Sequence, residues 1–128
     1  PQAMEKLLKG IALVSQAVVI GESRKYLTAL LTLDPDRARA WAKERGLPED
    51  LTAIAASDAA RAYVQGEVDR INAGLARYEQ IKRFALLASD FTVEGGELTP
   101  SQKVRRKVVS EKHAKAIEQL YEEGRDAT

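Results

Sequence analysis

The sequence contains no cysteine and a single histidine, His113. Without cysteine the chain can form neither a disulfide nor a thiolate zinc site, and it offers no thiol nucleophile. One histidine is too few for a multi-histidine metal site, and a histidine-based triad would have to be built around this one side chain. We therefore predict no metal site and no self-contained active site.

The chain also has little net charge and no long hydrophobic run. Twenty Lys and Arg oppose nineteen Asp and Glu, a balance that gives no sign of a surface built to coat nucleic acid. The longest uncharged apolar stretch, residues 11–21, includes Ser15 and Gln16 and is too short to cross a bilayer. No basic-then-apolar leader opens the chain, so we expect a cytoplasmic protein without a transmembrane segment; peripheral contact with a membrane stays open. Because the first residue is Pro1 and not methionine, we expect a piece of a longer protein.

Two segments near the N-terminus have the composition of paired β-strands. Residues 17–20 are rich in β-branched side chains, residues 26–33 form a second apolar run, and the polar residues 21–25 connect them. A hairpin alone is only marginally stable in water, so we expect helices to cover it. Residues 81–87 predict a third strand, and residues 91–93 a very short fourth strand before a turn at 94–97.

The helices are predicted from their start signals and their apolar faces. Asp34 and Pro35 are typical of a helix start, and Gly46 of a helix end. Residues 48–50 open a short alanine-rich helix in the same way, and Ser57 caps the longest helix. The side chains expected to face the core are Met4, Leu7, Leu8 and Ile11; Ala38, Trp41 and Ala42; Val64, Val68, Ile71, Leu75 and Tyr78; and Ala114, Ile117, Leu120 and Tyr121 of a last helix capped by Ser110.

Together these elements predict the fold class. The length suits a single domain spanning residues 1–128, and no linker or repeat divides the chain. We expect an α+β fold with a small three-stranded, mainly antiparallel sheet packed with about five helices.

One segment, residues 103–115, is strongly basic. A basic run is most often a solvated helix face, but it also suggests a non-enzymatic module that binds nucleic acid. Such modules interleave aromatic with basic side chains, whereas this run has no aromatic residue until Tyr121, beyond its end. The run contains a single acidic residue, Glu111. Its basic residues are Lys103, Arg105, Arg106, Lys107, Lys112 and Lys115.

The same region carries a family resemblance. Residues 97–109 resemble the last conserved core motif of the AMP-forming acyl-CoA synthetases, in the variant carried by long-chain fatty-acid–CoA ligases. Residues 14–22 and 81–87 also resemble the C-terminal domain of that subfamily, so the resemblance covers essentially the whole chain. The wider superfamily has Gly where this chain has Gln102; this departure fits the long-chain branch and makes the loop less flexible.

The resemblance implies that this chain is the mobile C-terminal lid of a two-domain enzyme, which activates a fatty acid with ATP to acyl-AMP and transfers the acyl group to coenzyme A. Its partner would be its own N-terminal domain, joined by a hinge just before Pro1, and that domain would hold ATP, Mg²⁺ and the fatty acid. The catalytic residue would be Lys103, placed between the fatty carboxylate and the α-phosphate, where a fixed cation lowers the barrier between converging anions. Isolated, the lid should fold, bind none of these ligands stably and be inactive.

Two further expectations accompany this assignment. A ligase that stops at the acyl-adenylate and hands it to a carrier protein is the alternative within the family. Arg24, Lys25 and Arg70 are candidates for contacts with the phosphates of coenzyme A, because phosphates attract cations, although exposed solubilising charges are the better-supported interpretation of each.

Overall fold

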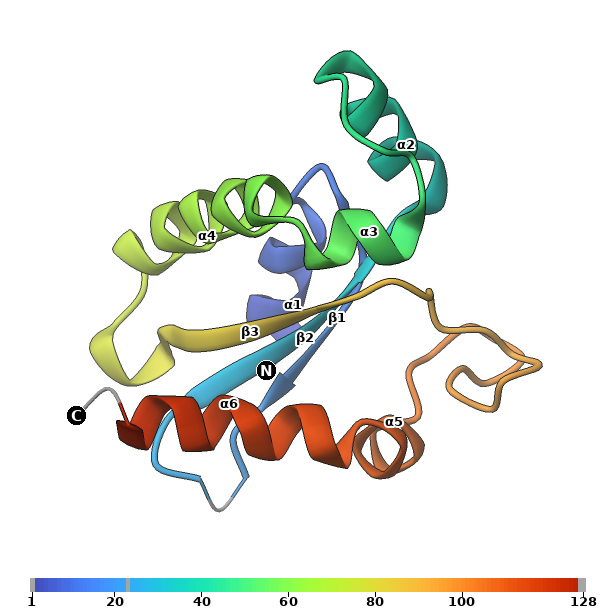
Figure 1. Ribbon diagram of the computed structural model, residues 1–128. Coiled ribbons are helices and arrows are strands. Elements are labelled where there is room, and N and C mark those ends of the chain that lie inside the picture. Colours follow the sequence, from blue (N-terminus) through green and yellow to red (C-terminus); the bar gives the residue numbers. More distant parts are fainter. Residues whose placement is uncertain (1, 23, 127–128) are drawn as a thin grey trace.

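The computed structural model describes residues 2–22 and 24–126, and its centre is a three-stranded sheet (Figure 1). The strands are β1 (Val14–Ile20), β2 (Leu27–Leu33) and β3 (Ile81–Leu87), in the order β1-β2-β3. β2 therefore lies in the middle and pairs with both neighbours. The predicted hairpin of β1 and β2 is confirmed; within its connection, Ser23 lies outside the described residues.

The sheet is mixed. β1 pairs with β2 antiparallel, with Ile20 opposite Thr28, and this hairpin is the antiparallel part expected from the sequence. β2 pairs with β3 parallel, with Leu27 opposite Ile81. Parallel neighbours need a long crossover, and residues 34–80 supply it. The predicted α+β fold class with a three-stranded sheet is confirmed.

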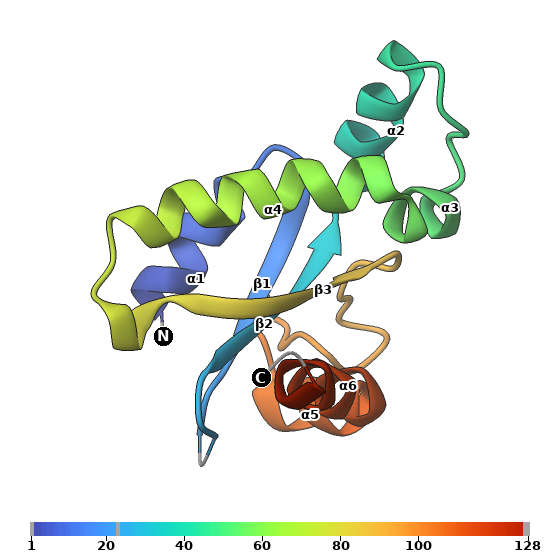
Figure 2. The ribbon, with the colours of Figure 1, turned by 60° about the vertical axis from the view of Figure 1, so that its left-hand side comes forward.

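Helices cover both faces of this sheet (Figures 1 and 2). The first four belong to one face and the last two to the other, because their buried side chains fall into two separate clusters. Within the described residues the α-helices are α1 (Gln2–Lys9), α2 (Pro35–Glu44), α3 (Leu51–Ala56), α4 (Asp58–Ala73), α5 (Arg106–Lys112) and α6 (Ala114–Asp126), and a 3₁₀ turn spans Arg77–Glu79.

The helix starts follow from side-chain caps. The carboxylate of Asp34 accepts a hydrogen bond from the main-chain N–H of Arg37 at 2.9 Å, and the hydroxyl of Ser57 accepts one from Ala60 at 3.1 Å. Both caps were predicted. For α3 the predicted start is shifted: Asp50 is itself the N-cap, and residues 48–49 precede the helix, because the Asp50 carboxylate accepts from the N–H of Ala53 at 3.0 Å.

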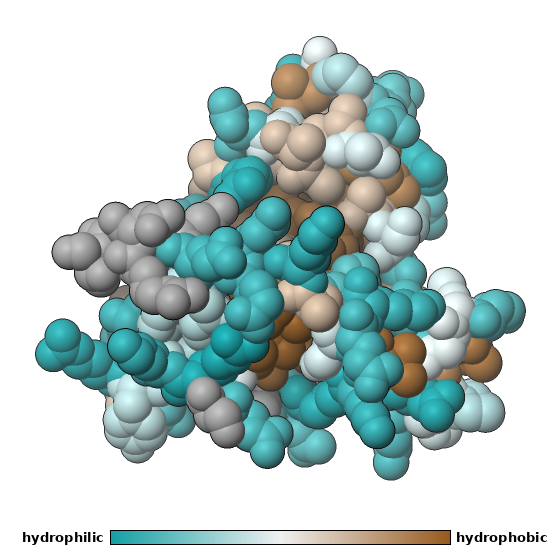
Figure 3. Space-filling model, turned by 60° about the horizontal axis from the view of Figure 1, so that its bottom comes forward, coloured by the Kyte–Doolittle hydropathy of each residue, from teal (hydrophilic) through white to brown (hydrophobic). Residues whose placement is uncertain are grey.

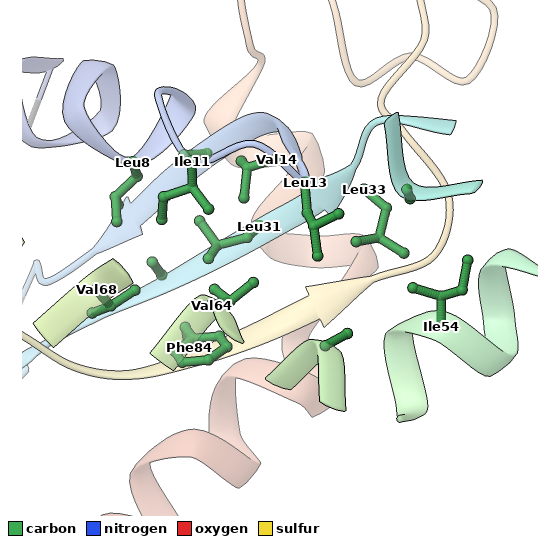
Figure 4. Packing of buried hydrophobic residues seen from close by; sticks show 14 of the residues in the cluster. Leu8, Ile11, Leu13, Val14, Leu31, Leu33, Ile54, Val64, Val68 and Phe84 are labelled. Carbon is green, nitrogen blue, oxygen red and sulfur yellow. The ribbon is translucent and has the colours of Figure 1, made fainter. Parts of the chain in front are cut away.

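Side chains of β2 reach both cores, since successive residues of a strand point to opposite faces. Leu31 and Leu33 are fully buried in the first core, between the sheet and α1–α4 (Figure 4). Leu30 is fully buried in the second core, between the sheet and α5–α6. The predicted inward face of α2 is confirmed, with Ala38 and Ala42 inaccessible to solvent.

The predicted stripe of α4 is correct at its centre and wrong at its end. Val64 and Val68 are buried against Leu31 and Phe84 in the first core (Figure 4), and Ile71 is partly buried beside it. The helix ends at Ala73, however, so the helical spacing does not extend to Tyr78. Tyr78 lies in the 3₁₀ turn with 83% of its surface exposed.

Val68 and Tyr78 belong to the same predicted apolar stripe but differ in burial, and this difference can be tested by mutation. Val68→Ala should lower the free energy of unfolding by about 1–3 kcal/mol, because it leaves a cavity in the first core. Tyr78→Ala should change it by no more than about 0.5 kcal/mol, because that side chain is in solvent. Denaturant unfolding of the two variants measures both. Equal losses would contradict the burial described for this helix.

Two predictions for the C-terminal third are wrong. Residues 91–93 form no strand, because the main-chain N–H of Phe91 donates to the Asp90 carboxylate at 2.8 Å and its ring is buried in the second core. Ser110 caps no helix; it lies inside α5, and the helical path is interrupted at His113. His113 is half-buried, with its ring 6.3 Å from that of Phe91.

The inward face of α6 is confirmed except at its first residue. Ile117, Leu120 and Tyr121 are buried, whereas Ala114 is exposed. The Tyr121 hydroxyl attaches the helix to the β1–β2 hairpin: it lies 2.8 Å from the main-chain oxygen of Tyr26 and 3.2 Å from that of Ile20. Burial raises the pKa of Tyr121, so the phenol stays protonated and remains a donor.

Candidate functional site

Lys103 lies just after the turn of a small hairpin formed by residues 97–105. Leu98 and Val104 form an isolated antiparallel bridge, and the main-chain N–H of Arg105 donates to the oxygen of Glu97 at 2.7 Å. The Lys103 side chain is exposed. The structure therefore displays the predicted catalytic lysine on an ordered projection from the domain.

Thr99 holds the main chain of Lys103 on both sides. Its N–H donates to the Lys103 oxygen at 2.8 Å, and its hydroxyl accepts from the Lys103 N–H at 3.0 Å. The Thr99 carbonyl also accepts from the N–H of Gln102 at 2.7 Å. These bonds close a tight turn, so the backbone of Lys103 has little freedom even though its side chain reaches into solvent.

Gln102 adopts a left-handed conformation, with φ of 64°. This region favours glycine, and a residue with a Cβ is strained there by about 1–2 kcal/mol. The geometry explains why the wider superfamily, as the motif resemblance implies, has glycine at this place. In this chain glutamine occupies the position, and the hydrogen bonds of Thr99 maintain its left-handed conformation.

The segment leading to this hairpin is fixed to the sheet by Asp90. Its carboxylate accepts hydrogen bonds from the hydroxyls of Ser15, at 2.6 Å, and Thr32, at 2.8 Å. Ser15 lies between Val14 and Ala17, where the pairing register of β1 and β2 shifts. Such an irregularity redirects side chains of the strand, which is consistent with the Ser15 hydroxyl pointing to Asp90. The sequence patterns missed Asp90, because all but one of its partners are distant in the chain and only its place just after a strand could have drawn attention.

The basic run of residues 103–115 forms no continuous helix face. It is divided among the hairpin, α5 and the start of α6. Arg106 forms an ion pair with Glu5 of α1, and Lys112 lies 3.8 Å from the Glu97 carboxylate. Nothing in this arrangement favours a nucleic-acid surface, since part of the charge is neutralised within the domain.

A groove of about 1040 Å³ lies between α1, the outer edge of β1, and α5 with α6. The face of the molecule turned forward in Figure 3 exposes apolar side chains between polar ones. In the groove, the edge of β1 is covered at Val19: its N–H donates to Glu5 at 2.8 Å, and Arg106 donates to its oxygen at 3.3 Å. These side chains occupy hydrogen-bonding groups that an added strand would use. Lys103 does not line this groove.

Two of the three cations suggested for coenzyme A form ion pairs with carboxylates of the same domain. Arg24 pairs with Glu118 and lies 4.6 Å from the ring centre of Tyr121, and the hydrogen bond to Glu118 raises the pKa of Arg24. Arg70 pairs with Glu67 at 3.0 Å, and this hydrogen bond lowers the pKa of Glu67. Lys25 instead borders a shallow depression beside Tyr78.

Two features are absent from residues 2–22 and 24–126. No group of three or more His, Cys, Asp or Glu side chains is placed to hold a metal ion there. No helix in this part of the chain is long and apolar enough to span a membrane.

Comparison with known proteins places this fold and lysine hairpin in a family. Residues 1–125 match the AMP-binding enzyme C-terminal domain, and the chain belongs to that family. It is 36% identical over 123 residues to the long-chain-fatty-acid–CoA ligase FadD15 of Mycobacterium tuberculosis. The matched region covers 94% of this chain and 20% of that protein. It is 31% identical over 127 residues to the peroxisomal long chain acyl-CoA synthetase 6 of Arabidopsis thaliana, covering 96% of this chain and 18% of that protein.

Solved structures of adenylating enzymes contain a domain of similar fold. The adenylation domain of a carboxylate reductase from Mycobacterium chelonae superposes with a TM-score of 0.73 at 27% identity, over 94% of this chain and 17% of that one. A Mycobacterium tuberculosis fatty acyl CoA synthetase, at 18% identity and a TM-score of 0.52, shares the fold. The chain thus spans about a fifth of the length of the relatives it matches.

Proposed function

We propose that this chain is the mobile C-terminal lid of a long-chain fatty-acid–CoA ligase, and that Lys103 is its catalytic residue. The observation that carries the proposal is the presentation of Lys103, whose exposed side chain projects from a main chain fixed by hydrogen bonds. Relatives of 36% and 31% identity are named as ligases or synthetases of this kind. A lysine displayed in this way suits a substrate that is bound by another domain.

In the proposed first step a fatty carboxylate oxygen attacks the α-phosphorus of ATP, the bond to the bridging oxygen breaks, and pyrophosphate leaves. Two anions converge in this step. The Lys103 ammonium would contact both and neutralise the charge that develops, an electrostatic effect that is strong when the donor is already in place. Mg²⁺ would be held by the N-terminal domain, because the described residues of this chain offer no cluster of ligands for it.

In the proposed second step the sulfur of coenzyme A bonds to the acyl carbon of the adenylate, the bond from that carbon to the phosphate oxygen breaks, AMP leaves, and the thiol proton is released to solvent. The lid would rotate between the steps and present another face. The shallow depression beside Tyr78, with a volume of about 560 Å³, supports such a face, since it is lined by Lys25, Arg77 and Lys82. An exposed aromatic ring among cations suits a nucleotide with phosphates. Alternating orientations let one small domain serve both steps.

The test uses the full-length protein that carries this domain. Supplied with ATP and a long-chain fatty acid, it should release pyrophosphate and form acyl-AMP, and adding coenzyme A should convert the adenylate to acyl-CoA. Product analysis by mass spectrometry distinguishes the outcomes. Acyl-AMP that is transferred to a carrier protein but not to coenzyme A would indicate the acyl-AMP ligase instead. No adenylate with any fatty acid would refute the proposal.

A further inference from the structure

The hairpin that carries Lys103 has an attachment to α5 through two charged residues. Glu97 begins the hairpin, and its main-chain oxygen accepts from the N–H of Arg105 at 2.7 Å. Lys112 is the last residue of α5. Its ammonium donates to the main-chain oxygen of Gly95, and its Nζ lies 3.8 Å from Oε2 of Glu97.

The Glu97 carboxylate organises the turn before the hairpin. Its side chain is only 14% exposed, and its Oε1 accepts from the main-chain N–H of Thr92 at 3.0 Å. Gly95 packs directly against it: a Cβ at Gly95 would lie 2.4 Å from that oxygen and 2.9 Å from the Thr92 hydroxyl. The turn is therefore folded around a carboxylate, and Lys112 supplies the opposite charge from the neighbouring helix.

We propose that Glu97 and Lys112 are positioning residues for Lys103 in the adenylation step. Asp90 fixes the start of this segment to the sheet, and the Glu97–Lys112 pair fixes the base of the hairpin to α5. Leu98, which is buried in the second core, and Val104, which packs against that core, also hold the hairpin. Loss of the pair should therefore loosen the base of the hairpin and shift Lys103 without releasing the hairpin from the domain. This inference rests on the proposed function of Lys103.

The size of the effect follows from how far the ammonium moves. A displacement of about 1 Å at a reacting group costs up to about a hundredfold in rate. An ion pair that is partly exposed contributes little to global stability, so the fold survives its loss. Loss of the Glu97–Lys112 pair should therefore slow the adenylation step while the protein stays folded.

The experiment compares both half-reactions in the full-length protein. Lys112→Met and Glu97→Gln keep side-chain size and remove the charge interaction. Each should slow acyl-adenylate formation about tenfold, with KM for ATP and for the fatty acid unchanged within about twofold. Acyl-CoA formation from supplied acyl-adenylate should keep its rate. Lys112→Arg retains the cation and should restore most of the adenylation rate.

A matched control and a second readout separate positioning from general destabilisation. Glu44→Gln removes another ion pair, Glu44–Arg45 at 3.7 Å at the C-terminal end of α2, and should leave both half-reactions unchanged. Hydrogen exchange should be faster at the amides of Leu98 and Arg105 in Lys112→Met and unaltered in Glu44→Gln. Both amides are hydrogen-bonded within the turn and hairpin.

The outcomes are distinguishable. If Lys103→Ala abolishes adenylation while Lys112→Met and Glu97→Gln keep the wild-type rate, the positioning role is wrong and the proposed function stands. Equal slowing of both half-reactions would also overturn it, since that would indicate a role in the whole domain. If Lys103→Ala leaves adenylation intact, the catalytic role proposed for Lys103 fails and the positioning role with it.

Discussion

Replacing Lys103 by Ala in the full-length protein should slow acyl-adenylate formation by about two to three orders of magnitude, the cost of removing one charge contact made in the transition state. The reason is the proposed position of the ammonium, between a fatty carboxylate and the α-phosphate. Acyl-CoA formation from supplied acyl-adenylate should be largely retained, because it uses another orientation of the lid. Acetylation of Lys103 should have the same effect, since it removes the charge and keeps the stem.

Single-turnover measurement of each half-reaction decides this prediction. Lys107→Ala is the matched control: it removes a lysine of the same basic run whose side chain is exposed on α5, and it should leave both rates unchanged. Equal losses in the two half-reactions of Lys103→Ala would mean that the lysine supports the fold or both orientations. Full retention of adenylation would remove the catalytic role from Lys103.

Leu31→Ala should lower the free energy of unfolding of the domain by about 2–5 kcal/mol, the usual cost of a leucine deleted from a packed core. Leu31 lies on the central strand, is fully buried, and contributes to the first core shared by the sheet and α1–α4 (Figure 4). Urea unfolding followed by circular dichroism measures the change. Because such a loss approaches the whole stability of a small domain, the variant is expected to be largely unfolded at moderate temperature.

Leu7→Ala provides the comparison for that measurement. Leu7 was expected to face the core, and that prediction is wrong: it lies on α1 with 48% of its surface exposed. We expect a change of no more than about 0.5 kcal/mol. Comparable losses in the two variants would mean that the burial assigned to β2 is wrong.

The elements that could be predicted are those whose signals are local. Asp34 and Ser57 cap helices through residues three positions ahead, and the hairpin of β1 and β2 follows from two apolar runs joined by a short polar connection. The parallel direction of β3 had no such signal, since it depends on how residues 34–80 cross the sheet. Tyr78 was misplaced because a continued apolar spacing does not show where a helix ends.

The candidate site likewise combines a feature that the sequence could indicate with features that only the folded structure shows. The motif resemblance pointed to Lys103, and the structure displays that residue just after the turn of a hairpin. The left-handed turn at Gln102 could not be read from its residue type, because glutamine has no preference for that conformation. The anchor at Asp90 joins residues far apart in the chain, Ser15 and Thr32, so only the folded structure brings it together.

The parallel pairing of β2 with β3 has a consequence for the order of folding. β1 and β2 are joined by a short connection, so their pairing closes a small loop and is entropically inexpensive. β3 can join only after the chain of residues 34–80 has been brought back to the sheet, and such non-local pairing slows folding. The second core needs β2 and the C-terminal helices, yet the Lys103 hairpin follows β3 in the chain. Asp90, which anchors the lysine hairpin to Ser15 and Thr32, closely follows β3, so we expect the lysine to be positioned only once β3 has joined the sheet.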